Sequence, residues 1–185
     1  MANFTKRELM KSFLELIEEK PISKISVKDI TTHCGVNRNT FYYHFQDVPT
    51  LIEAIVQEDT EQIISENPKI ESIEQCLDVA TSLILKRKKM VYHIYHSTER
   101  AIFEQYLWQI CEIVISSYYN SAFTDVPISD FDKAIINNYY KGLFFGLSMM
   151  ALEHGLEEDL RPFIHRVCEL KQNSIEEMLE SCRTF

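Results

Sequence analysis

Apolar residues recur at intervals of three and four along most of the chain, which is the period of amphipathic helices. Few breakers interrupt this pattern, since the chain has only 4 Gly and 5 Pro. N-cap residues and prolines set the expected helix ends. The pattern therefore predicts an all-helical (all-α) chain, with helices at about 4–19, 27–34, 38–44, 48–65, 72–88, 90–96, 98–122, 130–154 and 160–182.

The spacing also predicts which face of each helix is buried. For the long helix at 98–122 we expect the inward face to carry Ile102, Tyr106, Ile110, Ile113 and Val114, with Trp108 among them.

Residues 27–47 have the spacing of a helix-turn-helix, in which a second helix reads DNA. Ser26 can cap the first helix, and Asp29 completes a box-like start. Gly35 is suited to the turn, and Phe41 and Phe45 fall on one side of the second helix, where they can anchor it. The opposite side of that helix is then expected to face DNA.

Residue types on the outer side match known contacts to bases and phosphates. An arginine in the first turn, Arg38, can bond guanine in a bidentate way, and Asn39 can pair with adenine. The other residues are expected mainly to position the backbone. An alternative is that the aromatic residues pack against the next helix. The predicted DNA-binding residues are Lys28, Asn37, Arg38, Asn39, Thr40, Tyr42, Tyr43, His44 and Thr50.

Charge and composition narrow the class of protein. The net charge is −9, but residues 1–50 hold seven Lys and Arg against six Asp and Glu, a net +1, so the remainder carries −10. This asymmetry allows the N-terminal part to approach phosphates. The 5 cysteines lack CxxC pairs, which indicates neither a disulfide framework nor a zinc site. No apolar run reaches the roughly 20 residues of a membrane span, so we expect no membrane partner and a cytoplasmic location.

The helix-turn-helix residues resemble the signature of the TetR family of bacterial transcriptional regulators over about the first 65 positions. The resemblance implies a homodimer whose two heads read a palindromic operator in double-stranded DNA, and a body that binds a small-molecule effector and dimerises through its last two helices. Thr31 departs from the family's usual Ala, and Val48 and Pro49 replace its usual Lys and Glu. The matching residues, in order, are Ile30, Gly35, Val36, Thr40, Phe41, Tyr42, His44 and Phe45.

These observations predict a DNA-binding domain at 1–47, a connecting helix at 48–65 and an effector-binding and dimerisation domain at 66–185. The expected function is a dimeric regulator, a repressor by resemblance. An enzyme is not expected, because GxSxG, HExxH, P-loop and GxGxxG motifs are missing from the sequence, and no cofactor is predicted. The alternative is an adaptor that kept the fold but binds a protein partner, motivated by the lost lysine at Val48.

The C-terminal part carries two further candidate sites. His93 and His96 have a helical spacing that could hold a metal, but no nearby ligand completes the set, so no metal site is predicted. They are either core histidines or polar groups in an effector pocket. The candidate pocket residues are His93, His96, Tyr106, Trp108, Tyr140 and Phe144, although such aromatic residues more often form plain core.

Two glycines four residues apart, Gly142 and Gly146, leave a smooth strip on their helix where a second helix could approach closely. This strip suits either a dimer interface or packing within the chain. By resemblance, the last helix completes a four-helix interface. The candidate interface residues are Gly142, Gly146, Phe163, Val167, Leu170 and Ile175.

Overall fold

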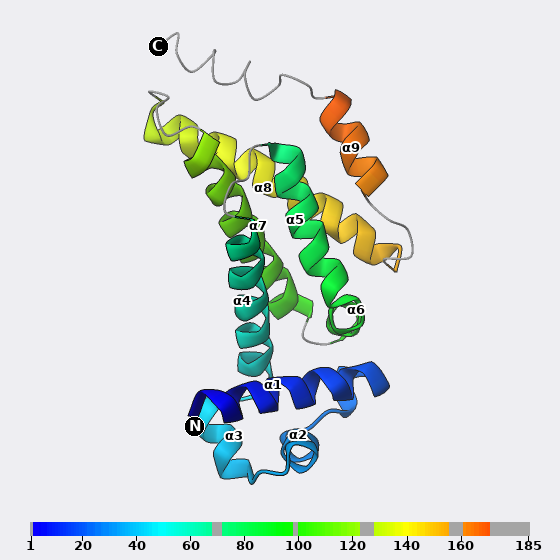
Figure 1. Cartoon of the computed structure of the whole chain (residues 1–185). Coiled ribbons are helices and arrows are strands. Elements are labelled where there is room, and N and C mark those ends of the chain that lie inside the picture. The colour runs from blue at the N-terminus through cyan, green and yellow to red at the C-terminus, as the bar shows by residue number, and fades with distance from the viewer. Residues whose placement is uncertain (1, 68–71, 98–99, 123–127, 156–160, 171–185) are drawn as a thin grey trace. The chain divides into compact units, whose positions relative to one another are not determined.

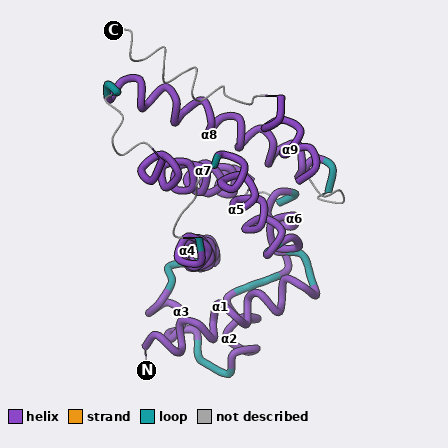
Figure 2. Tube along the Cα trace, turned by 45° about the horizontal axis from the view of Figure 1, so that its top comes forward, coloured by secondary structure: helices purple, strands orange, loops and turns teal. Residues whose placement is uncertain are grey.

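The computed structural model describes residues 2–67, 72–97, 100–122, 128–155 and 161–170. In these ranges the chain forms helices and no strands (Figures 1 and 2), which confirms the predicted all-helical fold. The predicted helix at 160–182 is described only to residue 170. The α-helices are α1 Ala2–Glu19, α2 Val27–Cys34, α3 Arg38–His44, α4 Val48–Glu66, α5 Ile73–Lys86, α6 Lys88–Tyr95, α7 Arg100–Ala122, α8 Asp130–Glu153 and α9 Arg161–Leu170, with a 3₁₀ helix, η1, at Ile22–Lys24.

The chain separates into two compact units. The first contains residues 1–62 and 87–106, and the second contains residues 63–86 and 107–185. The boundary between them therefore falls within α4 and within α7. The segment 87–106, which contains α6, belongs to the same unit as the helix-turn-helix.

In the first unit, α1 packs on α2 and α6, and α2 packs on α3 (Figure 1). Apolar side chains from these helices and from α4 form its core, as the spacing predicts. Two ion pairs attach the α6 end: Arg87 binds Asp59 of α4, and the Lys89 Nζ lies 2.8 Å from a Glu18 carboxylate oxygen of α1. The most buried core residues here are Leu9, Phe13, Ile17, Ile30, Phe41, Leu51 and Ile55.

In the second unit, α5 packs on α9 and meets α7, where the Cys76 thiol contacts the Val114 carbonyl oxygen at 3.4 Å. The buried Lys141 of α8 pairs with Glu112 of α7 and lies over the Trp108 ring, 4.4 Å from its centroid. This pairing lowers the pKa of Glu112. Lys141 thus links α8 to two residues of α7.

The inward face predicted for α7 is correct only in part. Val114 is buried and Tyr106 and Ile110 are half-buried, whereas Ile113 and Trp108 are 45% and 41% exposed. The pattern could not resolve the face, because apolar residues occur on nearly all sides of this helix and period alone then leaves its rotation open. Among the α7 side chains that the structure describes, the buried ones are Phe103, Leu107, Cys111, Val114, Ile115 and Tyr118, of which the pattern predicted Val114.

Of the helices in the described ranges, none combines the length and the apolar character that crossing a bilayer requires.

Candidate nucleic-acid interface

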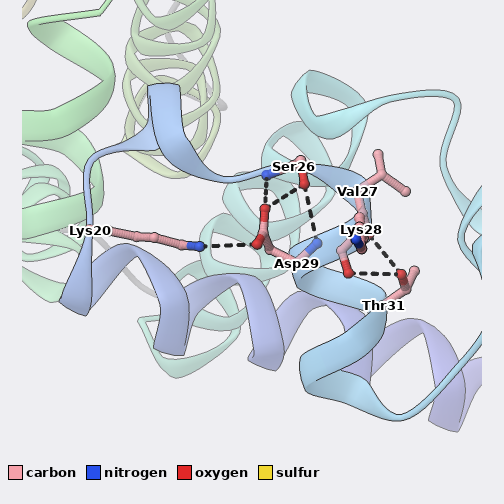
Figure 3. A network of polar contacts seen from close by, with 6 residues as sticks. All are labelled: Lys20, Ser26, Val27, Lys28, Asp29 and Thr31. Carbon is pink, nitrogen blue, oxygen red and sulfur yellow. Dashed lines mark hydrogen bonds and ion pairs between the residues drawn. The ribbon is translucent and has the colours of Figure 1, made fainter.

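The start of α2 is fixed by a reciprocal capping box (Figure 3). The Asp29 amide donates to the Ser26 hydroxyl at 3.2 Å, and the Ser26 amide donates to the Asp29 carboxylate at 2.8 Å. The Ser26 hydroxyl also contacts this carboxylate, and Lys20 Nζ lies 3.3 Å from it. The Ser26 hydrogen bonds, followed by Lys20, lower the pKa of Asp29 from 3.8 to about 2. The cap therefore stays ionised at neutral pH and satisfies amides that the helix leaves unpaired.

Thr31, the residue that departs from the family pattern, is buried in α2. Its hydroxyl donates to the Val27 carbonyl at 2.9 Å and lies 3.2 Å from that of Lys28 (Figure 3). A buried hydroxyl without a partner would be costly, so these backbone bonds explain how α2 accommodates it.

A left-handed glycine makes the turn between α2 and α3. Gly35 has φ +72°, and the next amide, that of Val36, donates to the Thr31 carbonyl at 2.9 Å. Bonds of this kind satisfy the last carbonyls of a helix. A Cβ added at Gly35 would meet no atom within 4 Å, so lack of space does not require glycine here. The positive φ requires it, because residues with a side chain rarely adopt this conformation.

The reader helix α3 is anchored from one side, as predicted. Phe41 is 0% exposed and Phe45 is 2% exposed, and their ring centroids lie 5.7 Å apart. Tyr43 is 78% exposed and Tyr42 is 56% exposed, so the interpretation in which they pack against α4 does not hold for these two side chains. His44 is half-buried with its ring centroid 4.9 Å from that of Tyr43.

The polar residues predicted to contact DNA divide into two groups. Lys28, Arg38 and Asn39 are exposed on α2 and α3, together with Tyr42 and Tyr43. By helical period Asn39 and Tyr43 lie nearly opposite the buried Phe41, whereas Arg38 is exposed in the first turn.

The second group takes part in helix caps. Asn37 Oδ1 accepts from the Thr40 amide at 2.9 Å and from the Thr40 hydroxyl at 3.1 Å. At the start of α4, Asp47 Oδ1 accepts from the Thr50 amide at 2.8 Å and from its hydroxyl at 2.7 Å. Both threonine hydroxyls already donate within the chain. To donate to a phosphate instead, each would first have to break its hydrogen bond to the capping residue. The sequence pattern identified the caps but not this competition.

The predicted pocket residues fall in both units. His93, half-buried, His96, exposed, and Tyr106, half-buried, belong to the first unit. The pKa of Tyr106 is raised by its partial burial and then by Glu53. In the second unit Tyr140 and Phe144 are buried core residues, and Trp108 is partly exposed beside Lys141.

The predicted interface residues lie at the surface of the second unit. Gly142 and Gly146 are exposed, and a Cβ added at either would meet nothing within 4 Å among the described residues. Phe163 is 47% and Leu170 69% exposed, Val167 is half-buried, and Ile175 lies outside the described residues.

Sequence reasoning missed three exposed apolar residues on the glycine side of α8. Phe131 is 74% exposed, and Ile135 and Tyr139 are 47% and 44% exposed. Their spacing of three and four with Gly142 and Gly146 puts all five on one face, a period that was available in the sequence. We call this set the α8 strip.

A metal site was also sought among side chains. The described part of the chain places no three His, Cys, Asp or Glu side chains where they could hold an ion together.

Comparison with known families gives two matches, which together cover most of the chain. Residues 9–55 match "Bacterial regulatory proteins, tetR family", and residues 71–173 match "Transcriptional regulator C-terminal region". The first match covers the helix-turn-helix, and the second covers more than half of the chain.

Individual relatives agree with these families. The chain is 23% identical to the uncharacterised HTH-type transcriptional regulator YxbF of Bacillus subtilis (strain 168), over 82% of this chain and 40% of the relative. It is 32% identical to DhaS, the HTH-type activator of the dhaKLM operon of Lactococcus lactis subsp. lactis (strain IL1403), over 34% of each chain. The matched regions thus span well under two thirds of both curated relatives.

A solved structure confirms the fold over nearly the full length. The dihydroxyacetone kinase operon activator DhaS superposes with a TM-score of 0.68 and 19% identity, covering 98% of this chain and 97% of that chain.

Proposed function

The chain belongs to the TetR family of bacterial transcriptional regulators, and from this membership we propose that it binds a palindromic operator as a homodimer whose occupancy a small-molecule effector changes. The observation that carries the proposal is the reader helix α3. It is held by buried Phe41 and Phe45, while Asn39 and Tyr43 are exposed on the opposite side and Arg38 is exposed in the first turn. We assign the DNA-binding domain to residues 1–47 and effector binding and dimerisation to residues 66–185, joined by the helix at 48–65.

Within α3, we assign base recognition to the first turn. Arg38 and Asn39 follow the Asn37 cap directly, at the end of a recognition helix that usually meets base edges. Tyr42 and Tyr43 present hydroxyls that can donate to phosphates, and Lys28 adds a full positive charge at the start of α2. Asn37, Thr40, His44 and Thr50 complete the set mainly by fixing helix ends and ring positions.

The proposed dimer uses the α8 strip. Glycines let helices approach closely, and the apolar residues beside them are exposed in the single chain. A second copy covering the same strip would remove them from water, and a twofold axis would pair each strip with itself. Half-sites are then expected about one DNA turn, or a multiple of it, apart.

We propose repression as the direction of regulation, since occupying a promoter requires operator binding alone. Activation is the second candidate, because DhaS, a relative over 34% of this chain, is an activator. A reporter carrying the operator at or upstream of the promoter distinguishes the two by the sign of the change.

The test begins with selection of genomic DNA fragments by the full-length protein. We expect Arg38→Ala to weaken binding of the selected fragment by about 1–3 kcal/mol and to relax specificity at one base pair. The control is Arg166→Ala, which removes an exposed arginine of α9. Equal binding by the Arg38 variant and the wild type would refute the role of Arg38. Selection of no fragment, together with capture of a defined protein partner, would favour the adaptor alternative.

A further inference from the structure

A pocket of about 240 Å³ lies between α1 and α4 in the first unit, on helices that the effector proposal leaves unused. Met10 and Leu14 of α1 and Ile55 of α4 line it with apolar surface. An apolar cavity of roughly 150 Å³ already accommodates benzene, so this volume suits a ligand with a short carbon skeleton.

Three cations, two carboxylates and the neutral Gln62 complete the lining. Arg7, Lys11 and Arg87 face Glu58 and Asp59, so the lining residues carry one net positive charge. Both carboxylates already hold a guanidinium, which leaves them poorly placed to bind a cationic ligand as well. Lys11 pairs with Glu15 outside the lining, so the preference for an anion depends on the N–H donors of the three cations rather than on net charge.

The inner wall is the Arg87–Asp59 pair. Arg87 Nε and Nη2 donate to the two Asp59 oxygens at 2.7 and 3.1 Å, and Asp59 is only 6% exposed. A guanidinium has five N–H donors, so this bidentate bond uses only part of the capacity of Arg87. Asp59 thus holds the Arg87 guanidinium in position, and the remaining N–H groups of Arg87 can donate to a ligand.

The outer wall can rearrange at low cost. Arg7 Nε lies 3.2 Å from Glu58 Oε1, and Lys11 Nζ lies 3.9 Å from Glu15 Oε1, with all four side chains substantially exposed. Exposed pairs of this kind contribute little to stability, so Arg7 and Lys11 can turn toward a ligand.

From this lining we infer that the α1–α4 pocket binds a small organic oxyanion, a carboxylate or a phosphate monoester with a short apolar chain. Arg7, Lys11 and Arg87 hold the oxyanion, and the chain lies against Met10, Leu14 and Ile55. Because α1 packs on α2 and α4 follows the reader helix, a ligand between them shifts operator affinity. This regulatory step rests on the proposed DNA-binding function, whereas binding of the anion does not.

The binding test is an NMR titration of the full-length protein at constant ionic strength. The probes are butanoate, n-butyl phosphate, inorganic phosphate, n-butanol and n-butylammonium. We expect the two organic anions to shift signals of α1 and α4 saturably and the other three to bind at least about tenfold more weakly. A preference for butanoate or for butyl phosphate assigns the head group. Equal binding of n-butylammonium, or shifts confined to other helices, would overturn the inference.

Variants locate the site. Arg7→Gln leaves Glu58 solvated and should weaken butanoate binding about fivefold, whereas Lys24→Gln, an exposed lysine of η1, serves as the matched control and should change it less than about twofold. Lys11→Gln is the second variant if Arg7→Gln does not fold, and Leu14→Trp should block the pocket by filling it. Equal loss in the Arg7 and Lys24 variants would refute the site.

The regulatory step is read from operator affinity with and without butanoate. We expect a change in the wild type that the Arg7 variant loses. Binding of butanoate without any change in operator affinity would overturn the regulatory step alone. Failure of the protein to bind any DNA would instead reject the proposed function, and the titration would still decide whether the pocket takes an anion.

Discussion

Substitution of the two glycines in the α8 strip tests the proposed dimer interface. Alanine at both positions should stabilise the separate chain, whereas leucine at both should destabilise the dimer. Neither glycine has a positive φ, both are exposed, and an added Cβ would meet nothing within 4 Å among the described residues. Glycine in an exposed helix interior costs about 1 kcal/mol relative to alanine. For the separate chain, Gly142→Ala with Gly146→Ala should therefore raise the free energy of unfolding by about 2 kcal/mol.

Leucine at the same positions should break the dimer. Overpacking costs about 1–3 kcal/mol at each site, and a twofold interface contains each site twice. Four such sites give at least about 4 kcal/mol, which is about a thousandfold in dimer Kd. The control is Ala134→Leu, an exposed position about 100° around α8 from the centre of the strip.

Sedimentation velocity over a concentration series measures the dimer Kd, and urea unfolding of the dissociated protein measures chain stability. A dimer Kd for the leucine double variant within about threefold of the wild-type value would refute the α8 strip as the interface, because overpacking at four sites could not be that small. Destabilisation of the separate chain by the alanine pair would instead show that the strip packs within the chain.

Substitutions at two further positions test the geometry of the helix-turn-helix. Gly35→Ala should lower the free energy of unfolding by about 1 kcal/mol in urea titrations, because alanine is strained at φ +72°, while Gly35→Asn should cost less; equal stability of all three would contradict the role of backbone conformation. The pKa of Asp29 is lowered to about 2, so its cap contributes stability that is fully present above about pH 4 and is lost as the pH falls toward 2. Asp29→Asn should therefore flatten the pH dependence of thermal unfolding between pH 4 and 2, and an unchanged slope would show that other carboxylates cause it.

The ends of α2 and α3 could be predicted from the sequence to the residue, because local hydrogen bonds fix them. Ser26, Gly35 and Asn37 act on amides and carbonyls within a few positions of themselves. Local chemistry of this kind is the same in any protein, which is why the boundaries did not depend on the rest of the fold.

Features that depend on distant residues could not be predicted. The bond between Asp59 and Arg87 joins positions 28 apart, and no periodic pattern pairs one acid with one base among many. The buried side of α7 could be predicted only in part for a related reason. Apolar residues occur on several sides of this helix, and the helices that pack against it decide which side is covered. The predicted effector residues His93 and Trp108 lie in different units, which neither residue type nor local spacing indicates.

The positive charges of the helix-turn-helix predict how strongly its DNA affinity depends on salt. The hydroxyls of Thr40 and Thr50 donate to Asn37 and Asp47 and are therefore already used within the chain. The full positive charges among the predicted DNA-binding residues are those of Lys28 and Arg38.

Each phosphate neutralised contributes about −0.9 to the slope of log K against log salt. A single head in which both Lys28 and Arg38 face phosphates should then give a slope near −1.8, and a dimer with two heads engaged near −3.6. If Arg38 instead bonds a base, the dimer slope falls toward −1.8, and Arg38→Ala changes specificity while leaving the slope in place. Lys28→Gln should in either case make the dimer slope less steep by about 1.8. Filter-binding titrations between 50 and 200 mM salt, roughly the range over which such slopes are resolved, would measure it. A wild-type slope much steeper than −3.6 would show that cations outside the helix-turn-helix reach the DNA.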